Sequence, residues 1–167
     1  MIPISATFLD LHKAIQAAGG WKDYHLFEFQ NVPMLDAQRL AGLPDEEDPE
    51  DRVAHAKAVK LHAFFGETPE ISCIYNYDFG DNWRALVTMN EIQSVLFKFK
   101  RALLNGARAW PLEDMGGTGG YEDGVAAIGM TQDELKTAPD ATERLDWMGA
   151  WHPDVLDLEG LKRKFDR

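Results

Sequence analysis

Cysteine is almost absent from this chain, and the single copy, Cys73, sets the first limits on the protein. One cysteine cannot close an internal disulfide or supply the thiolates of a usual structural zinc cluster. This usage suits a reducing compartment, so we expect a cytoplasmic protein. The sequence also lacks an apolar run of about eighteen residues and a basic-then-apolar N-terminal segment, so we expect neither a membrane span nor a secretory signal.

Positive charge is scarce as well. Lysine and arginine number 17 against 28 acids, which gives a formal net charge of −11. Nucleic-acid binding depends on basic residues that neutralise phosphates, so this balance makes a nucleic-acid partner unlikely. Residues 44–51 hold six of the acids, and the rest of the chain has 22 acids against 17 bases. Basic residues around 98–108 could form a patch, although solvated surface charge is the simpler explanation.

The sequence does contain enough hydrophobic residues, 45% of the chain, to form a buried core. We therefore predict one domain over residues 1–167. Thr7 and Asp10 form a capping-box pattern that begins a helix, and Gly19–Gly20 ends it. Alternation predicts a strand over 24–29. An acidic loop follows over 31–51, and then a second helix with Asp48 as its N-cap.

The most regular pattern lies between residues 71 and 89. Apolar and polar residues alternate from Ile71 to Phe79 and again from Trp83 to Met89, with a turn at 80–82, so we predict a hairpin. A further strand is predicted over 95–99, and helices over 121–130, 141–148 and 154–161. The predicted class is α+β: an antiparallel or mixed sheet of four to five strands, with helices packed on one side.

Four segments together resemble the plasmid pRiA ORF-three-like family. They are residues 11–29; Tyr77-Asp78-Phe79-Gly80-Asp81-Asn82-Trp83; Glu113-Asp114 with Gly116-Gly117 and Gly120-Tyr121; and Asp146-Trp147 with residues 152–154. The resemblance implies a small cytoplasmic α+β protein without an established activity. Some relatives are labelled as mobile-element, resolvase-like proteins, but no serine nucleophile amid an arginine cluster is visible here.

The chain departs from the family pattern in three places. Trp110 and Met115 stand where relatives usually carry cysteines, and Leu112 replaces a proline, so any redox or metal role of those cysteines would be absent. Arg84 and Ala85 stand where relatives tend to have a histidine. Many relatives also have a strand before the first helix, so we expect this sheet to lack an edge strand or the sequence to begin late.

Acidic residues in the two glycine-containing blocks form the first candidate site. Asp78 and Asp81 lie across the hairpin turn, and Glu113 and Asp114 precede the glycine-rich loop. If these acids converge, a cation would relieve their repulsion; Mg²⁺, Mn²⁺ or Ca²⁺ suits such oxygen ligands, and His25 could add a nitrogen. This site would support metal-dependent hydrolysis, including that of phosphodiesters. The simpler explanation is that the aspartates accept backbone N–H groups in turns.

The second candidate surface is the glycine loop with nearby aromatic rings. Gly116, Gly117 and Gly120 before a helix could approach a phosphate, or pack closely against an aromatic ring. Tyr77, Trp83 and Tyr121 could contact a ligand if they are exposed, although rings at strand spacing are more often core. Our leading hypothesis is a binding or interaction module for an unknown protein or small ligand that uses this hairpin and loop. A divalent-metal-dependent hydrolase is the alternative.

Overall fold

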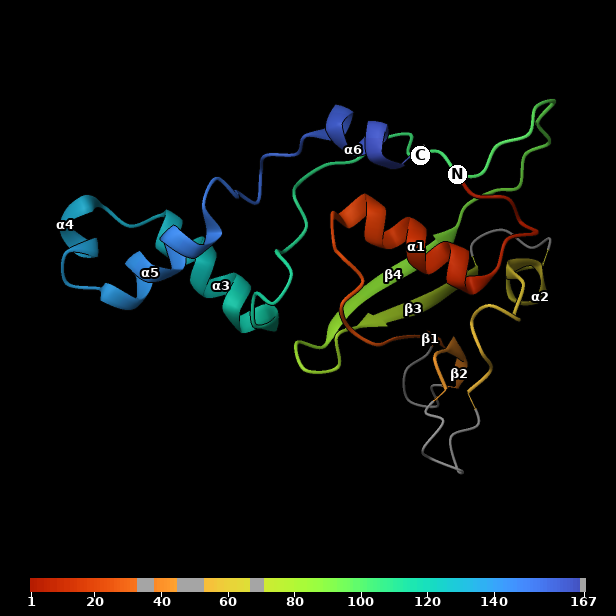
Figure 1. The fold of residues 1–167 in the computed structure, drawn as a ribbon, viewed down its shortest axis with the longest axis horizontal. Coiled ribbons are helices and arrows are strands. Elements are labelled where there is room, and N and C mark those ends of the chain that lie inside the picture. Colours follow the sequence, from red (N-terminus) through yellow and green to blue (C-terminus); the bar gives the residue numbers. More distant parts are fainter. Residues whose placement is uncertain (33–37, 45–52, 67–70, 166–167) are drawn as a thin grey trace.

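The computed structural model describes residues 1–32, 38–44, 53–66 and 71–165 (Figure 1). Its centre is an open antiparallel sheet in the strand order β2-β1-β3-β4. The strands are β1 (Phe27–Asn31), β2 (Arg39–Gly42), β3 (Ile71–Tyr77) and β4 (Trp83–Met89). With six helices in the described part of the chain, this arrangement confirms the α+β class and a sheet of four strands.

The β3–β4 hairpin follows the alternation in the sequence. Tyr75 pairs with Ala85 and Tyr77 pairs with Trp83. Tyr75 and Tyr77 are almost fully buried, together with Phe27 of β1. Alternate residues of a strand point to opposite faces, so one face of the sheet carries the aromatic core. The aromatic side chains at these strand positions therefore belong to the hydrophobic core, as their spacing suggested.

Helix α1 (Phe8–Gly19) supplies the other side of this core. It begins with the expected capping box, because Asp10 N–H donates to Thr7 Oγ1 (3.1 Å) and Thr7 N–H donates to Asp10 Oδ2 (2.9 Å). Phe8 and Leu11 are buried in the same cluster as the strand aromatics. Figure 1 shows α1 lying across β3 and β4, and α6 (Leu158–Phe165) packs against α1.

The remaining C-terminal helices form a separate group beyond the hairpin end of the sheet (Figure 1). They are α3 (Gly117–Ile128), α4 (Gln132–Leu135) and α5 (Pro139–Met148), and α3 packs against α5. The glycine-rich loop enters α3 next to the hairpin, so this arrangement positions the candidate site. In the described ranges, none of the helices combines the length and apolarity that a bilayer crossing requires.

Several elements differ from the sequence-based prediction. The strand predicted over 95–99 is wrong: residues 90–111 form neither strand nor helix, none of the described strands pairs with them, and Leu96 and Phe97 are exposed. The second helix is only α2 (Leu61–Phe65), while its predicted cap, Asp48, lies outside the described residues. Strand β2 occupies part of the predicted 31–51 loop.

Helix boundaries in the C-terminal half also shift. Helix α3 begins at Gly117 rather than Tyr121, so the glycines form its first turn instead of a loop before it. Helix α4 was not predicted. Helix α6 begins at Leu158, four residues later than expected, and Asp154 therefore does not cap it. Strand β1 begins at Phe27 because the N–H groups of Tyr24 and His25 bond to a side chain instead of a strand.

Candidate functional site

Asp78 organises the turn between β3 and β4. Its Oδ1 accepts hydrogen bonds from Gly80 N–H (3.1 Å) and Asp81 N–H (3.2 Å). Asp78 itself has a positive φ of 55°, a conformation that aspartate tolerates better than most residues. The residue is largely buried. One carboxylate oxygen of Asp78 therefore holds the turn, as the simpler explanation proposed, and the other remains available to the site.

The hairpin turn and the glycine segment meet directly. Gly116 N–H donates to Asp81 Oδ2 (2.9 Å), across 35 residues of sequence. Gly117 approaches so closely that a Cβ there would lie 2.5 Å from the Asp81 carbonyl oxygen, and its φ is +65°. Only glycine suits such a position. The Asp81 carboxylate already accepts the N–H at the N-cap of α3, which is one of the donors that a bound phosphate would use there.

Glu113 ties the same loop to the N-terminal half. It accepts hydrogen bonds from the Tyr77 hydroxyl and from Lys22 N–H (2.5 Å). The Tyr77 oxygen in turn accepts from Tyr24 N–H (3.0 Å) and His25 N–H (3.4 Å). Burial raises the pKa of Tyr77, and the bond to Glu113 raises it further, so the phenol stays neutral and remains a donor. One hydroxyl thus fixes three segments that are distant in sequence.

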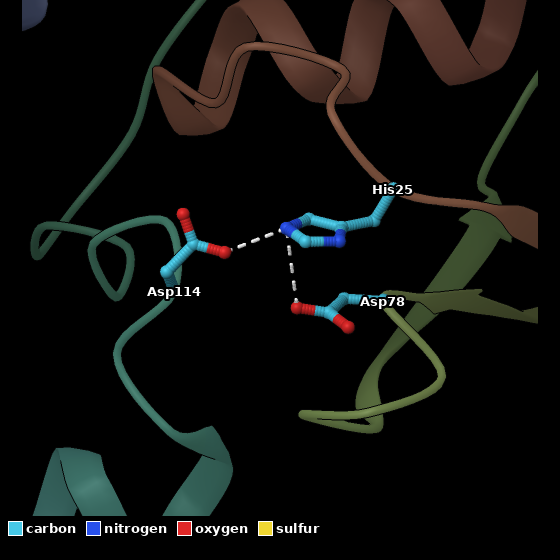
Figure 2. Close-up of side chains that lie close together, drawn as sticks. All are labelled: His25, Asp78 and Asp114. Carbon is cyan, nitrogen blue, oxygen red and sulfur yellow. Dashed lines mark hydrogen bonds and ion pairs between the residues drawn. The ribbon is translucent and has the colours of Figure 1, made fainter.

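The side chains of His25, Asp78 and Asp114 form a compact cluster (Figure 2). His25 Nε2 lies 2.7 Å from Asp114 Oδ1 and 3.5 Å from Asp78 Oδ2. Desolvation of the ring opposes protonation, but the hydrogen bond to Asp114 and the charges of Asp78, Asp114 and Glu113 outweigh it and raise the pKa of His25. The cluster is accessible from solvent, because the Asp114 side chain is 60% exposed and that of His25 is 31% exposed.

The four acids named from the sequence therefore serve two purposes. Asp78 and Asp114 share His25, whereas Asp81 and Glu113 use carboxylate oxygens to hold backbone and hydroxyl donors. The single centre of four carboxylates is not formed in this arrangement. What remains is a smaller set of one imidazole and two carboxylates, and its role as a ligand site stays a prediction.

An aromatic groove of about 460 Å³, here called the tryptophan groove, opens between the start of β4 and the chain that leads into α3. It is lined by Trp21, Tyr75, Trp83, Arg84, Ala85, Ala107, Arg108, Ala109, Trp110, Pro111, Thr118 and Tyr121. Of the predicted contact residues, Trp83 and Tyr121 line the groove. Tyr77 is buried behind it, where it stacks on Trp21 at 4.7 Å between ring centroids.

The walls of the tryptophan groove are held by specific contacts. Trp21 Nε1–H donates to the Pro111 carbonyl oxygen (2.8 Å), and the rings of Trp21 and Trp110 meet edge to face at 4.8 Å. Trp83 Nε1 is buried and has no hydrogen-bond acceptor among the residues that the structure describes. Sequence reasoning missed Trp21, Trp110 and Arg108 as groove residues. Trp110 stands next to the second glycine-containing block, but Trp21 is far from both blocks in the sequence, so no local signal could have joined the two.

These features define an α+β protein with an open antiparallel sheet, whose hairpin tip, glycine segment and tryptophan groove meet at one end. The chain belongs to the plasmid pRiA4b ORF-3-like protein family, which it matches over residues 1–160. The resemblance found in the sequence motifs is thereby confirmed.

Two relatives show how far the similarity extends. The uncharacterized protein y4hQ of Sinorhizobium fredii (strain NBRC 101917 / NGR234) is 31% identical over 150 residues, which cover 90% of this chain and 72% of that protein. The crystal structure of MM3350, a protein of unknown function from Methanosarcina mazei Go1, matches with a TM-score of 0.75 and 31% identity. That match covers 95% of this chain and 85% of the archaeal one. The family is thus defined by fold and sequence, and its activity is not established.

Proposed function

We propose that this protein is a ligand-binding module and that the tryptophan groove binds a small planar aromatic molecule with an anionic group. The observation that carries the proposal is the groove itself, with Trp21, Trp83 and Trp110 in its walls. The groove includes Trp83 and Tyr121, two of the aromatic contact residues predicted from the sequence. It leaves out Asp81 and Glu113, because their carboxylates already bond within the protein.

The size and lining of the groove support a small ligand. A volume of about 460 Å³ falls within the range of roughly 300–1,000 Å³ that is usual for small-molecule sites. Such sites are mainly apolar and aromatic, with a few polar groups that orient the ligand. Stacking of a flat ring on an aromatic side chain contributes about 1–3 kcal/mol in nucleobase complexes. A planar ligand can stack in the same way on the partly exposed indoles of Trp83 and Trp110.

Charge favours an anionic ligand. The two charged residues that line the groove are both arginines, Arg84 and Arg108, although the whole chain carries a net charge of −11. Arginine presents a planar fork of donors that suits carboxylate and phosphate groups. Arg108 pairs with Asp154 at 3.3 Å, but both side chains are 66% exposed, so water screens this pair and a ligand can compete for the guanidinium.

Calorimetric titration with three matched naphthalenes tests the proposal: 2-naphthoate, 2-naphthalenemethanol and 2-naphthylmethylammonium. We expect the anion to bind best and the cation worst, by about tenfold or more between them, because one favourable charge contact of about 1.4 kcal/mol changes affinity tenfold. Arg108→Gln should reduce the preference for the anion. Arg163→Gln, an exposed arginine on α6, is the control and should leave that preference unchanged.

A second pair of variants tests the location. Ala107 is exposed and lines the groove, so Ala107→Phe should fill it and weaken 2-naphthoate binding at least tenfold. Ala54→Phe is the matched control, since Ala54 is also exposed but lies beside β2. Equal binding by wild type and Ala107→Phe would reject the groove. Equal affinity for all three naphthalenes would reject the anionic class of ligand.

A further inference from the structure

We infer that His25, Asp78 and Asp114 form a binding site for a borderline first-row divalent cation of the Zn²⁺ and Co²⁺ type. The three donors come from the segment before β1, the end of β3 and the loop before α3 (Figure 2). One donor atom from each residue lies within 4.8 Å of the other two. This site is separate from the tryptophan groove and does not depend on the ligand proposed there.

The spacing of the donors suits an ion of this size. Zn–N and Zn–O distances of about 2.0–2.2 Å in a tetrahedron place two ligand atoms roughly 3.3–3.5 Å apart. His25 Nε2 and Asp78 Oδ2 already lie 3.5 Å apart. Asp114 Oδ1 lies 2.7 Å from the same nitrogen and within 4.8 Å of the Asp78 oxygen, so its side chain has to shift by about an ångström to reach both ligand spacings. Its side chain is 60% exposed, so this adjustment meets little resistance from packing.

The protein already orients the Asp78 carboxylate and anchors the backbone of the segment that carries His25. The Asp78 carboxylate is fixed through Oδ1, which accepts the N–H groups of Gly80 and Asp81, so Oδ2 is left facing His25. The backbone of the His25 segment is joined to β3, because Asp78 N–H donates to the Leu26 carbonyl oxygen (3.0 Å). Outer contacts of this kind hold ligands in place before the ion arrives, which reduces the cost of ordering them.

The excess of negative charge around His25 also favours a bound cation. Among the residues that the structure describes, the carboxylates of Asp78 and Asp114 share a single cationic partner, His25. Glu113 and Asp81 add two more acids to the same loops. An excess of carboxylates around one imidazole is relieved by a divalent ion more completely than by one proton.

The donor set decides which ion fits. Mg²⁺ and Ca²⁺ prefer sites built from oxygen alone, and such a site would have needed Asp81 and Glu113 as further ligands. One imidazole nitrogen with two carboxylate oxygens suits Zn²⁺, Co²⁺ or Mn²⁺ better, with affinity rising from Mn²⁺ to Co²⁺. Three protein ligands and an exposed edge leave a position for water, which is the pattern of open zinc sites. We therefore expect the site to bind Zn²⁺ or Co²⁺ in preference to Mg²⁺ and Ca²⁺.

Titration of the purified chain with Zn²⁺, Co²⁺, Mn²⁺ and Mg²⁺, followed by calorimetry, tests the site. We expect one equivalent of Zn²⁺ or Co²⁺ to bind, Mn²⁺ to bind more weakly and Mg²⁺ to give no heat. Bound Co²⁺ should also produce a visible absorption band whose intensity reports its coordination. A bound ion stabilises the folded state, so the melting temperature should rise with the concentration of Zn²⁺.

Three variants remove ligands while keeping the fold. In Asp78→Asn the amide oxygen can still accept the turn N–H groups, and in Asp114→Asn the side chain still tolerates the φ of +59°. His25→Gln retains a polar side chain. Each should lower Zn²⁺ affinity at least tenfold and weaken the Co²⁺ band. Asp146→Asn on α5 and His62→Gln on α2 are the matched controls and should bind like wild type.

The competing explanation is that a protonated His25 pairs with both carboxylates and no ion binds. It predicts no heat and no melting shift with Zn²⁺ at up to about 1 mM, and that result in the folded wild-type chain would overturn the inference. Zn²⁺ binding that all three ligand variants retain would overturn it too, because the ion would then sit elsewhere. Circular dichroism of each variant separates loss of binding from loss of fold.

Discussion

Gly119 and Gly120 are neighbours in the first turn of α3, yet replacing each by alanine should change stability in opposite directions. A Cβ on Gly119 meets no heavy atom within 4 Å. Alanine is a better helix former than glycine by about 0.5–1 kcal/mol, so Gly119→Ala should stabilise the protein by about that amount. A Cβ on Gly120 would lie 1.8 Å from the Met115 carbonyl oxygen, which is backbone and cannot rotate away.

The cost at Gly120 follows from that distance. Cβ atoms essentially never approach another heavy atom closer than 3.0 Å, so the loop that contains Met115 must move by more than an ångström. Forced displacement in a packed region costs about 1–3 kcal/mol, and occasionally more. At about 2–4 °C per kcal/mol for a chain of this size, Gly120→Ala should melt roughly 2–12 °C lower than wild type. Gly119→Ala should melt slightly higher.

Thermal melting and urea unfolding of both variants measure this contrast. The two variants should also differ in Zn²⁺ affinity. Met115 adjoins Asp114, so the loop movement in Gly120→Ala displaces a proposed ligand and should weaken Zn²⁺ binding. Gly119→Ala is the internal control for both readouts. If Gly120→Ala melts within a degree of wild type, the close approach of α3 to the loop before it is incorrect, and so is the placement of Asp114.

Three further outcomes are expected. Tyr77→Phe should lose about 1–3 kcal/mol in urea unfolding, because the half-buried N–H groups of Tyr24 and His25 lose their acceptor and Glu113 loses a donor. Burial lowers the pKa of His12 despite its bond to Asp23, so the unfolded chain binds the proton more readily. Stability should therefore fall as pH drops below about 6.5, by at most about 1.4 kcal/mol per unit, and His12→Gln should flatten that slope; an unchanged slope would contradict the assignment. Burial raises the pKa of Cys73 to about 12, so a thiol reagent at pH 8 should react only as urea unfolds the chain, and rapid labelling of the native protein would refute this.

The sequence predicted those elements whose signals are local. The capping box at Thr7 and the alternation over 71–89 specify their own helix and hairpin, and both are present. The alternation over 95–99 did not produce a strand, because a strand also needs a neighbour to pair with, and none of the described strands pairs with these residues. Strand β2 was missed for the opposite reason, since a weak local pattern is stabilised by its pairing with β1.

The candidate site was predictable in composition but not in arrangement. The motifs named Asp78, Asp81, Glu113, Asp114 and His25, and the structure brings all of them to one end of the sheet. Which oxygen bonds to which donor is decided by turn geometry and by the Tyr77 hydroxyl, and neither is visible in a linear sequence. The tryptophan groove was not foreseen, because Trp21 and Trp110 lie 89 positions apart and meet only through tertiary packing.

The bond between Asp81 and Gly116 has a consequence for how the molecule can be divided. It joins the sheet to the C-terminal helices at the point where Trp21 also reaches across to Pro111. A fragment that stops near residue 100 would keep all four strands and α1, yet it would possess neither Asp114 nor the outer wall of the groove. The tryptophan groove and the His25, Asp78 and Asp114 cluster are therefore built from both halves of the chain, and we expect neither half to form them on its own.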